Sequence, residues 1–183
     1  MKNKDLFIFL ADGYKGGANT FLFHQMQYLL KKNRKVLLID KNPSETFPKI
    51  NKKIKSFKID IFSKKNEKIL LLTNILKSDN KSKKFIIFTN FFIFIKYFFF
   101  FRKLQNKQNK IILTLHSGIL EMSLIRFLAS VIFSFIYKNI DYLIFGSNSA
   151  KFWWKDRFPW MNIIKSPVHY NGVKVNKKII AKK

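Results

Sequence analysis

The chain alternates short apolar runs with longer stretches in which apolar residues recur every three or four positions. The short runs lack a clean polar alternation, which predicts strands that are covered on both faces. The longer stretches have the spacing of helices with one apolar stripe. The predicted strands are 6–11, 35–40, 57–62, 84–90, 110–118 and 141–147, with 162–168 as a candidate for the last one. The predicted helices are 18–32, 67–77, 119–138 and 149–158.

The order of these elements predicts the fold class. Strands separated by helical segments favour a parallel sheet, so we expect an α/β, Rossmann-like, doubly wound sheet. A length of 183 residues suits one domain, and no internal repeat or Gly/Ser linker divides it. Segments rich in Lys and Asn are typical of surface connections and lie at 49–55, 63–68 and 77–84.

The turn after the first predicted strand is the first candidate for a binding site, and its sequence over 12–21 is DGYKGGANTF. In parallel sheets ligands bind beyond the carboxyl ends of the strands. Gly16 and Gly17 would let a ligand approach the free amides at the start of the helix, with Asn19 or Thr20 as cap. A tight turn that needs only a positive φ explains the same glycines, and the residues alone leave both interpretations open.

Two nucleotide-binding motifs can be compared with this turn. The phosphate-binding string G-x-x-x-x-G-K-[ST] does not occur, and GYKGGA does not supply the G-x-G-x-x-G of dinucleotide-binding proteins. Asp40 does stand at the end of the second predicted strand, where a ribose-binding acid would lie. A dehydrogenase or an NAD-dependent sugar epimerase is therefore disfavoured.

The formal charge of +26 suggests a nucleic-acid partner, because clustered cations release counterions when they meet phosphates. Only four of the 36 basic residues are Arg, the residue favoured for bidentate contacts with bases and phosphates. Lys, Asn, Ile and Phe are abundant together, a bias that an AT-rich genome also produces. We therefore predict no nucleic-acid partner and retain an attraction to anionic phospholipids or nucleotide phosphates, with a merely solvated basic face as the alternative.

The same composition limits the cofactors and the location. Zero cysteines exclude disulfides and thiolate metal sites, and three widely spaced histidines form no metal-binding pattern. We predict no metal and no cofactor. The first apolar stretch, of about six residues, is too short for the core of a signal peptide, so we expect a cytoplasmic chain.

Two apolar segments raise the question of a membrane. The run FFIFIKYFFFF at 91–101 is shorter than the ~20 residues of a membrane span, and Lys96 interrupts it. The predicted helix 119–138 is apolar nearly all round. Its narrow polar stripe consists of Ser123, Arg126, Ser130, Ser134 and Lys138. Such a helix is either buried or lies in a membrane interface, and the many Lys residues favour peripheral attachment to the inner face of the plasma membrane.

Four local features, taken in order, resemble one enzyme family. They are YKGGANTFLFHQMQYLLKKNRKVLLID, KIILTLHSG, DYLIFGSNSAKFWW and SPVHYNGV. Together they resemble the N-terminal, acceptor-side domain of GT-B fold retaining glycosyltransferases of family 4, which includes many bacterial cell-envelope sugar transferases. The matching positions are Gly16 and Gly17 in the loop after strand one, Thr114 and His116 ending a central strand, Ser147 before a helix, and Asn171, Gly172 and Val173 near the domain crossover.

The resemblance implies a domain over 1–172 and a basic tail over 173–183 as the candidate start of the interdomain crossover. It also implies transfer of a hexose from a nucleotide-sugar to a cell-envelope glycan or lipid-linked acceptor in polysaccharide biosynthesis. In the family, a second domain holds most of the nucleotide-sugar site, and the eleven residues after Gly172 cannot build one. We therefore expect a truncated product or a separate donor-binding chain, and poor turnover by this chain alone.

By the same resemblance, His116 is the catalytic candidate, which would hydrogen-bond the transferred sugar or the acceptor. A packed histidine bonded to a backbone carbonyl is the alternative. The candidates for substrate binding are Gly16, Gly17, Asn19, Ser117, Glu121, Ser147 and Asn171. Among them, Glu121 is equally explained by its place at a helix start, Ser147 is favoured as a helix cap, and Asn171 as a turn.

Two other function classes remain open at this point. One is a noncatalytic module that binds glycan or lipid, or a subunit of a split transferase. The other is a basic nucleic-acid-binding domain.

Overall fold

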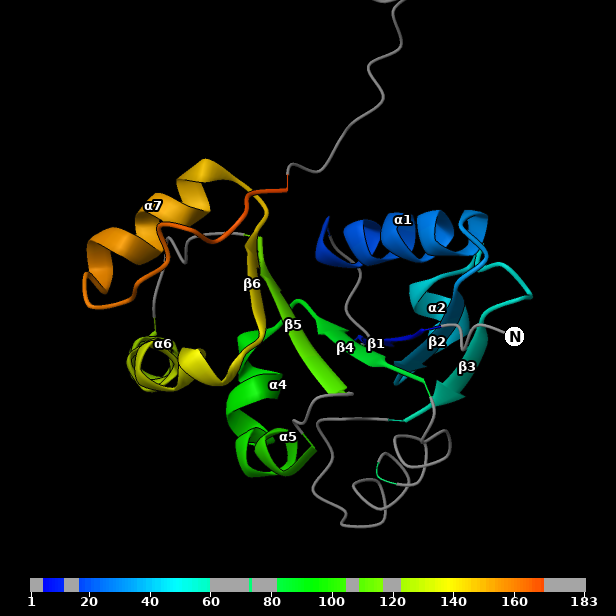
Figure 1. Ribbon diagram of the computed structural model, residues 1–183, viewed down its shortest axis with the longest axis horizontal. Helices are drawn as coiled ribbons and strands as arrows, with labels where there is room; N and C mark the ends of the chain where they lie inside the picture. Colours follow the sequence, from blue (N-terminus) through cyan, green and yellow to red (C-terminus); the bar gives the residue numbers. More distant parts are fainter. Residues whose placement is uncertain are drawn as a thin grey trace, which may run out of the picture.

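The computed structural model describes residues 5–11, 17–59, 73, 82–104, 109–116 and 123–169. Within them, six parallel strands form one sheet in the order β3-β2-β1-β4-β5-β6 (Figure 1). The strands are β1 (Leu6–Leu10), β2 (Lys35–Asp40), β3 (Lys55–Lys58), β4 (Lys84–Phe88), β5 (Asn109–Leu115) and β6 (Tyr142–Phe145). The predicted α/β, Rossmann-like sheet is thus confirmed.

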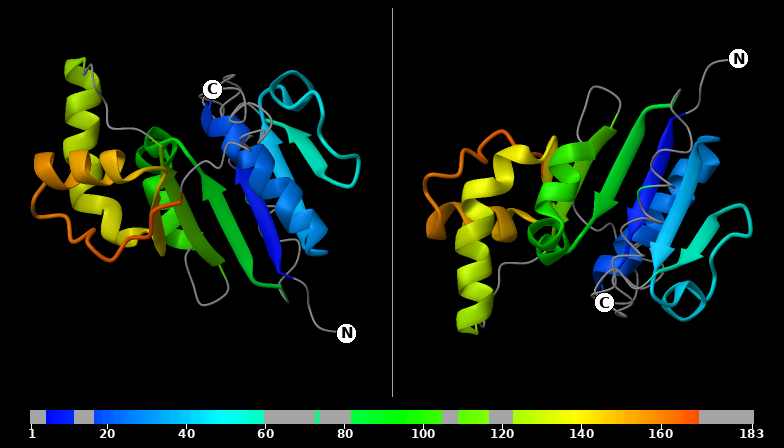
Figure 2. Two further views of the ribbon diagram at one scale, coloured as in Figure 1. Left: turned by 90° about the horizontal axis from the view of Figure 1, so that it is seen from above. Right: turned by 90° about the horizontal axis from the view of Figure 1, so that it is seen from below.

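Helices cover both faces of the sheet, with α1 on one side and α4, α5 and α6 on the other (Figures 1 and 2). The helices are α1 (Gly17–Lys31), α2 (Pro43–Thr46), α4 (Phe91–Lys96), α5 (Phe98–Leu104), α6 (Leu124–Ile136), the 3-10 helix η1 (Tyr137–Asn139) and α7 (Asn148–Arg157). No helix among the described residues has the length and apolar composition that crossing a bilayer requires.

Two apolar layers explain why the strands lack polar alternation. On the α1 side, Phe9 of β1 and Leu38 of β2 pack with Leu22 and Met26 of the helix. On the other side, alternate strand residues such as Ile8 pack in a layer that also contains side chains of α4, α6 and α7. Because both faces of every central strand are buried, both sets of alternate residues must be apolar.

The strand order fixes where a ligand can bind. The chain proceeds outward in one direction through β1, β2 and β3 and in the other through β4, β5 and β6. Ligands of such sheets bind beyond the carboxyl ends of the strands, where the order reverses. This point lies between β1 and β4, and α1 is the helix that follows β1.

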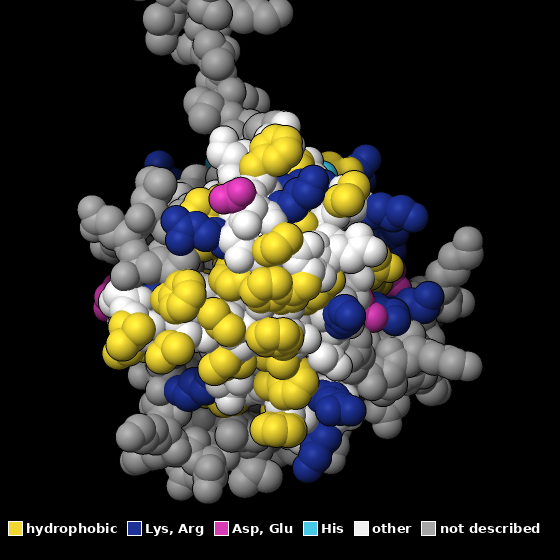
Figure 3. Space-filling model, turned by 90° about the vertical axis from the view of Figure 1, so that its left-hand side faces the viewer, with side chains coloured by type: hydrophobic (Ala, Val, Ile, Leu, Met, Phe, Trp, Pro, Cys, Tyr) yellow, Lys and Arg dark blue, Asp and Glu magenta, His cyan; other side chains and the backbone are white. Residues whose placement is uncertain are grey.

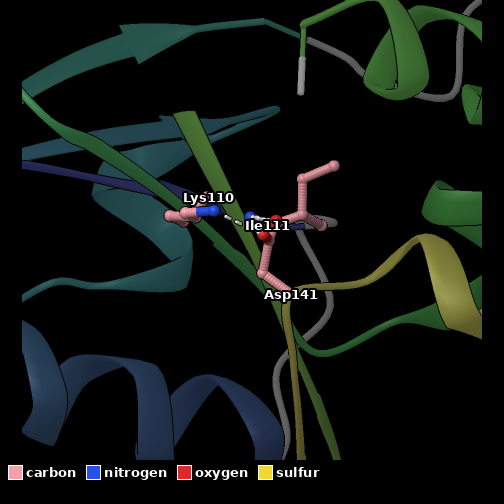
Figure 4. A network of polar contacts seen from close by, with 3 residues as sticks. All are labelled: Lys110, Ile111 and Asp141. Atoms are coloured by element: carbon pink, nitrogen blue, oxygen red, sulfur yellow. Dashed lines mark hydrogen bonds and ion pairs between the residues drawn. The ribbon is translucent and has the colours of Figure 1, made fainter. Parts of the chain in front are cut away.

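At the opposite, amino-terminal edge, Asp141 holds β5 and β6 together (Figure 4). Its carboxylate accepts hydrogen bonds from Lys110 Nζ and from the Ile111 N–H, both at 2.9 Å. Its own N–H donates to the Ile111 carbonyl at 3.0 Å. The hydrogen bond with Asp141 raises the pKa of Lys110. These contacts fix the start of β6 beside β5, and they lie away from the carboxyl edge.

Some predicted boundaries need correction. The segment 162–168 is not a strand, since it contributes a single bridge between Val168 and Phe145. Pro167 has no N–H for a ladder, so only its carbonyl pairs, with the Phe145 N–H at 3.0 Å. The predicted strand 57–62 is instead Lys55–Lys58 among the described residues. The predicted helix 67–77 lies outside the described residues except for Thr73, which is helical.

Candidate functional site

The candidate site lies at the carboxyl edge of the sheet, beside the first turns of α1. His116 directly follows β5, and its ring meets the ring of Phe21 edge to face, with centroids 4.6 Å apart. Phe21 is one turn along the helix that begins at Gly17. The imidazole and the start of α1 therefore share one rim of the sheet.

The end of β6 packs against the same histidine. The Gly146 N–H donates to the Leu115 carbonyl at 2.7 Å, which brings the two strand ends together. A Cβ added at Gly146 would lie 2.8 Å from Nδ1 and 3.0 Å from Cα of His116. Only a glycine leaves room for His116 here. This role of Gly146 was not predicted, although a lone glycine between β6 and Ser147 is visible in the sequence.

The chemistry of His116 follows from its burial. Neither ring nitrogen has a hydrogen-bond partner among the described residues, and both atoms are shielded from solvent. Burial lowers the pKa of His116 to about 4. The ring is therefore neutral at neutral pH, with one nitrogen free to donate and the other to accept. The histidine is packed, as the alternative predicts, but no backbone carbonyl of the described residues accepts a hydrogen bond from its ring.

Two more buried polar side chains lie along this edge. Thr114 precedes His116 by two positions in the chain, so both side chains face α1. Asp40 ends β2, two residues after the α1-facing Leu38, and is fully buried. The side-chain oxygens of Asp40 and Thr114 have no partner among the described residues. Since β1 and β4 lie between them, about 14 Å separates these two side chains, too far to act on one atom.

The predicted site residues divide into three groups. Gly17 begins α1, and a Cβ added there meets no atom of another described residue within 4 Å. Asn19 lies buried inside the first turn, so the prediction that it or Thr20 caps the helix is wrong. Ser147 caps α7 by accepting the Ala150 N–H at 3.0 Å, which confirms the cap interpretation. Gly16, Ser117, Glu121, Asn171, Gly172 and Val173 lie outside the described residues.

A cavity adjoins the start of α1. It has a volume of about 260 Å³ and lies between the first turns of α1 and the segment after α2, lined by Asn19, Thr20, Phe23, Thr46, Phe47, Pro48 and Lys49. A larger one, of about 490 Å³, is lined by residues that begin strands, such as Leu6 and Lys35, and so lies at the opposite edge from His116. No group of three His, Asp or Glu side chains in the described parts of the chain is placed to hold a metal ion.

No family model and no curated protein matches the chain in sequence. Among solved structures, the chain is similar to an alpha-glucosyltransferase in complex with UDP-glucose and DNA containing an abasic site, with a TM-score of 0.53 and 16% identity. The match covers 93% of this chain and 42% of that one. The chain thus shares its fold with a part of that alpha-glucosyltransferase and spans less than half of its length.

The burial of His116 predicts a pH dependence of stability. The His116 side chain takes up a proton near pH 6.5 in the unfolded chain and only near pH 4 in the folded chain. Its contribution to the free energy of unfolding therefore falls as the pH drops between these values and is constant above pH 6.5. We expect a loss of about 2 kcal/mol, less than full linkage gives because the ring is partly exposed. Urea unfolding at neutral and mildly acidic pH measures it. In His116→Gln the free energy of unfolding should depend less on pH. Equal pH profiles for this variant and the wild-type chain would contradict the lowered pKa of His116.

Proposed function

We propose that this chain is the acceptor-side half of a sugar-transferring enzyme. It would hold an acceptor against a nucleotide-sugar whose binding site is completed by a donor-binding domain or a separate chain. The observation that carries the proposal is His116 at the carboxyl end of β5, neutral, in contact with the first turns of α1 and without a hydrogen-bond partner in the described part of the chain. The fold, shared with part of an alpha-glucosyltransferase, supports it.

The chemistry of sugar transfer fits these groups. As the anomeric bond breaks, the sugar gains oxocarbenium character and negative charge develops on the leaving diphosphate. A neutral imidazole at His116 accepts a hydrogen bond from a hydroxyl of the sugar or acceptor without repelling the developing positive charge. The amides at the start of α1, next to Gly17, carry partial positive charge and stabilise the diphosphate.

The remaining assignments follow the family resemblance. Gly16 would act with Gly17, and Ser117 and Glu121 would reach the acceptor. The acceptor is a glycan or lipid-linked glycan of the cell envelope, and the reaction takes place at the inner face of the plasma membrane. The nucleotide-sugar is a co-substrate, and no metal or other cofactor is needed.

A nucleic-acid acceptor is the second candidate. The formal charge of +26 favours it, and the similar alpha-glucosyltransferase was solved with DNA. DNA binding that weakens steeply with salt, together with no response to glycans, would support this candidate. Binding to glycans without DNA affinity would support the first.

The proposal can be tested by thermal shift on the full chain, with UDP-glucose as donor probe and polyprenyl-phosphate-linked sugars as acceptor probes. We expect the acceptor probes to raise the melting temperature and UDP-glucose alone to have little effect. His116→Ala should weaken acceptor binding about tenfold, the loss of one hydrogen bond to a neutral group. The matched control is His169→Ala, because His169 is exposed and bonds through its backbone N–H. Unchanged binding by His116→Ala, or robust turnover by the purified chain alone, would refute the proposal.

Gly17→Ala separates a ligand site from a merely tight turn. Because an added Cβ meets no neighbour, the free energy of unfolding should stay equal or rise by less than about 1 kcal/mol. If a ligand approaches the backbone at Gly17, the same methyl group must weaken donor or acceptor binding. Urea unfolding and the thermal shift measure the two effects, and a variant with full ligand binding would assign Gly17 to the turn alone.

A further inference from the structure

Helix α6 has its polarity inverted relative to an ordinary surface helix. Its buried residues are Ala129, Ser130, Phe133 and Ser134. Its exposed residues are almost all large and apolar; Ile125 is 75% exposed and Phe135 66%. We define the α6 face as these exposed side chains together with Trp160, which stacks on Phe135: Leu124, Ile125, Phe127, Leu128, Ile132, Phe135 and Trp160.

Local hydrogen bonds explain how the serines can point inward. The Ser130 hydroxyl donates to the Arg126 carbonyl at 2.9 Å, and the Ser134 hydroxyl to the Val131 carbonyl at 2.7 Å. The Trp160 indole N–H donates to Ser134 Oγ at 3.1 Å. The buried hydroxyls are therefore satisfied, and small residues let the helix lie close against its neighbours. The fold does not use the outward apolar side chains, so their burial is left to something outside the described part of the chain.

Basic side chains surround the α6 face. Figure 3 shows apolar side chains gathered on this side of the molecule, with Lys and Arg around them. Over 123–169 the only acidic residues are Asp141, which is paired with Lys110, and Asp156. The basic residues of the same segment are Arg126, Lys138, Lys151, Lys155, Arg157 and Lys165. An apolar centre with a cationic surround is complementary to a layer of acyl chains under anionic headgroups.

We propose that the α6 face inserts into the surface of an anionic phospholipid leaflet. The apolar side chains enter the boundary between headgroups and acyl chains, and the surrounding cations contact the lipid phosphates. Trp160, 51% exposed, suits this depth because its ring is apolar and its N–H is satisfied. A second copy of the chain is a poorer occupant, because two molecules of charge +26 repel each other.

This inference rests on the proposed location at a membrane and assigns the surface that makes the contact. Leu124, the first residue of α6, follows His116 by eight positions, so the two lie within about 28 Å of each other. The start of the α6 face therefore lies no more than about 28 Å from His116, and we expect an acceptor with a lipid anchor to span this distance.

The test is co-sedimentation of the full chain with vesicles of phosphatidylglycerol and phosphatidylcholine, compared with phosphatidylcholine alone, together with tryptophan fluorescence. We expect binding to the anionic vesicles only, weakened by salt, with a blue shift of the emission. Ile132→Ser/Phe135→Ser should lower the partition coefficient about tenfold or more. The matched control for Phe135→Ser is Tyr28→Ser, because Tyr28 is an exposed aromatic residue on α1, across the sheet. Phe135→Ser should have the lower partition coefficient of the two.

Four results would overturn the inference. They are no binding to anionic vesicles, equal vesicle binding by the double variant and the wild-type chain, a wild-type dimer that the double variant dissociates, and DNA binding by the wild-type chain that the double variant loses. Acceptor binding by thermal shift is measured without vesicles. Binding of the acceptor probes without binding to vesicles would thus refute only the assignment of the α6 face. Binding to vesicles without binding of the acceptor probes would refute only the proposed function.

Discussion

Phe133→Ala is expected to lower the free energy of unfolding by about 3–5 kcal/mol. Phe133 is fully buried, with ring centroids 5.5 Å from Phe91, 6.3 Å from Phe94 and 5.3 Å from Trp154. These neighbours belong to α4 and α7, and Phe91 and Trp154 also contact each other. Because each is held by its own helix, they cannot refill the space that the removed ring leaves. Urea unfolding followed by far-UV circular dichroism gives the free energy.

Phe135→Ala is the matched control, since it is the same substitution two residues further along the same helix. Phe135 is 66% exposed, so its removal should change the free energy of unfolding by no more than about 0.5 kcal/mol. The pair therefore reports which side of α6 faces the sheet. Equal losses for the two variants, or a larger loss for Phe135→Ala, would mean that α6 packs by its other side and that the α6 face is not exposed.

This orientation of α6 could not be predicted from the sequence. The helix itself was predicted, because a long apolar segment between two strands has few other structures available. Its apolar residues occur all round, however, and the narrow stripe that includes Ser130 and Ser134 would be expected to face water. The structure places these serines inside because backbone carbonyls of the same helix and Trp160 Nε1 satisfy their hydroxyls. Such local compensation leaves no trace in hydrophobic periodicity.

The sheet was predictable because buried parallel strands are continuous apolar runs, and β1, β2 and β4–β6 each coincide with one. The segment 162–168 shares that composition, but it follows α7 through a turn and pairs with β6 only by Val168. In this segment the apolar composition indicates buried side chains, but it does not indicate the hydrogen-bonded pairing of a strand. The cap assigned to Asn19 failed for a related reason, since the sequence does not fix the residue at which α1 begins.

The candidate site was predictable where one residue follows one element, as His116 follows β5 and Gly17 begins α1. Burial of the imidazole and the role of Gly146 depend instead on contacts between β5, β6 and α1. Gly146 is thirty positions from His116, and no local pattern connects them. The same holds for Asp40, whose buried carboxyl group lies on β2, three strands away from β5 in the sheet.

Gly146→Ala is expected to disturb the site and the fold together. The new methyl carbon would lie 2.8 Å from His116 Nδ1 and 3.0 Å from its Cα, so both the ring and the backbone of His116 must move. Overpacking of this kind costs about 1–3 kcal/mol of stability. A displaced ring is more hydrated, so the pKa of His116 should rise from about 4 toward 6.5, which an NMR titration of the imidazole measures. Gly17→Ala, with open space for its methyl group, is the control for a glycine change on the same rim. If Gly146→Ala kept both the stability and the low pKa, the close approach of β6 to the imidazole would be wrong, and with it the rigid placement of His116 on which the proposed sugar transfer rests.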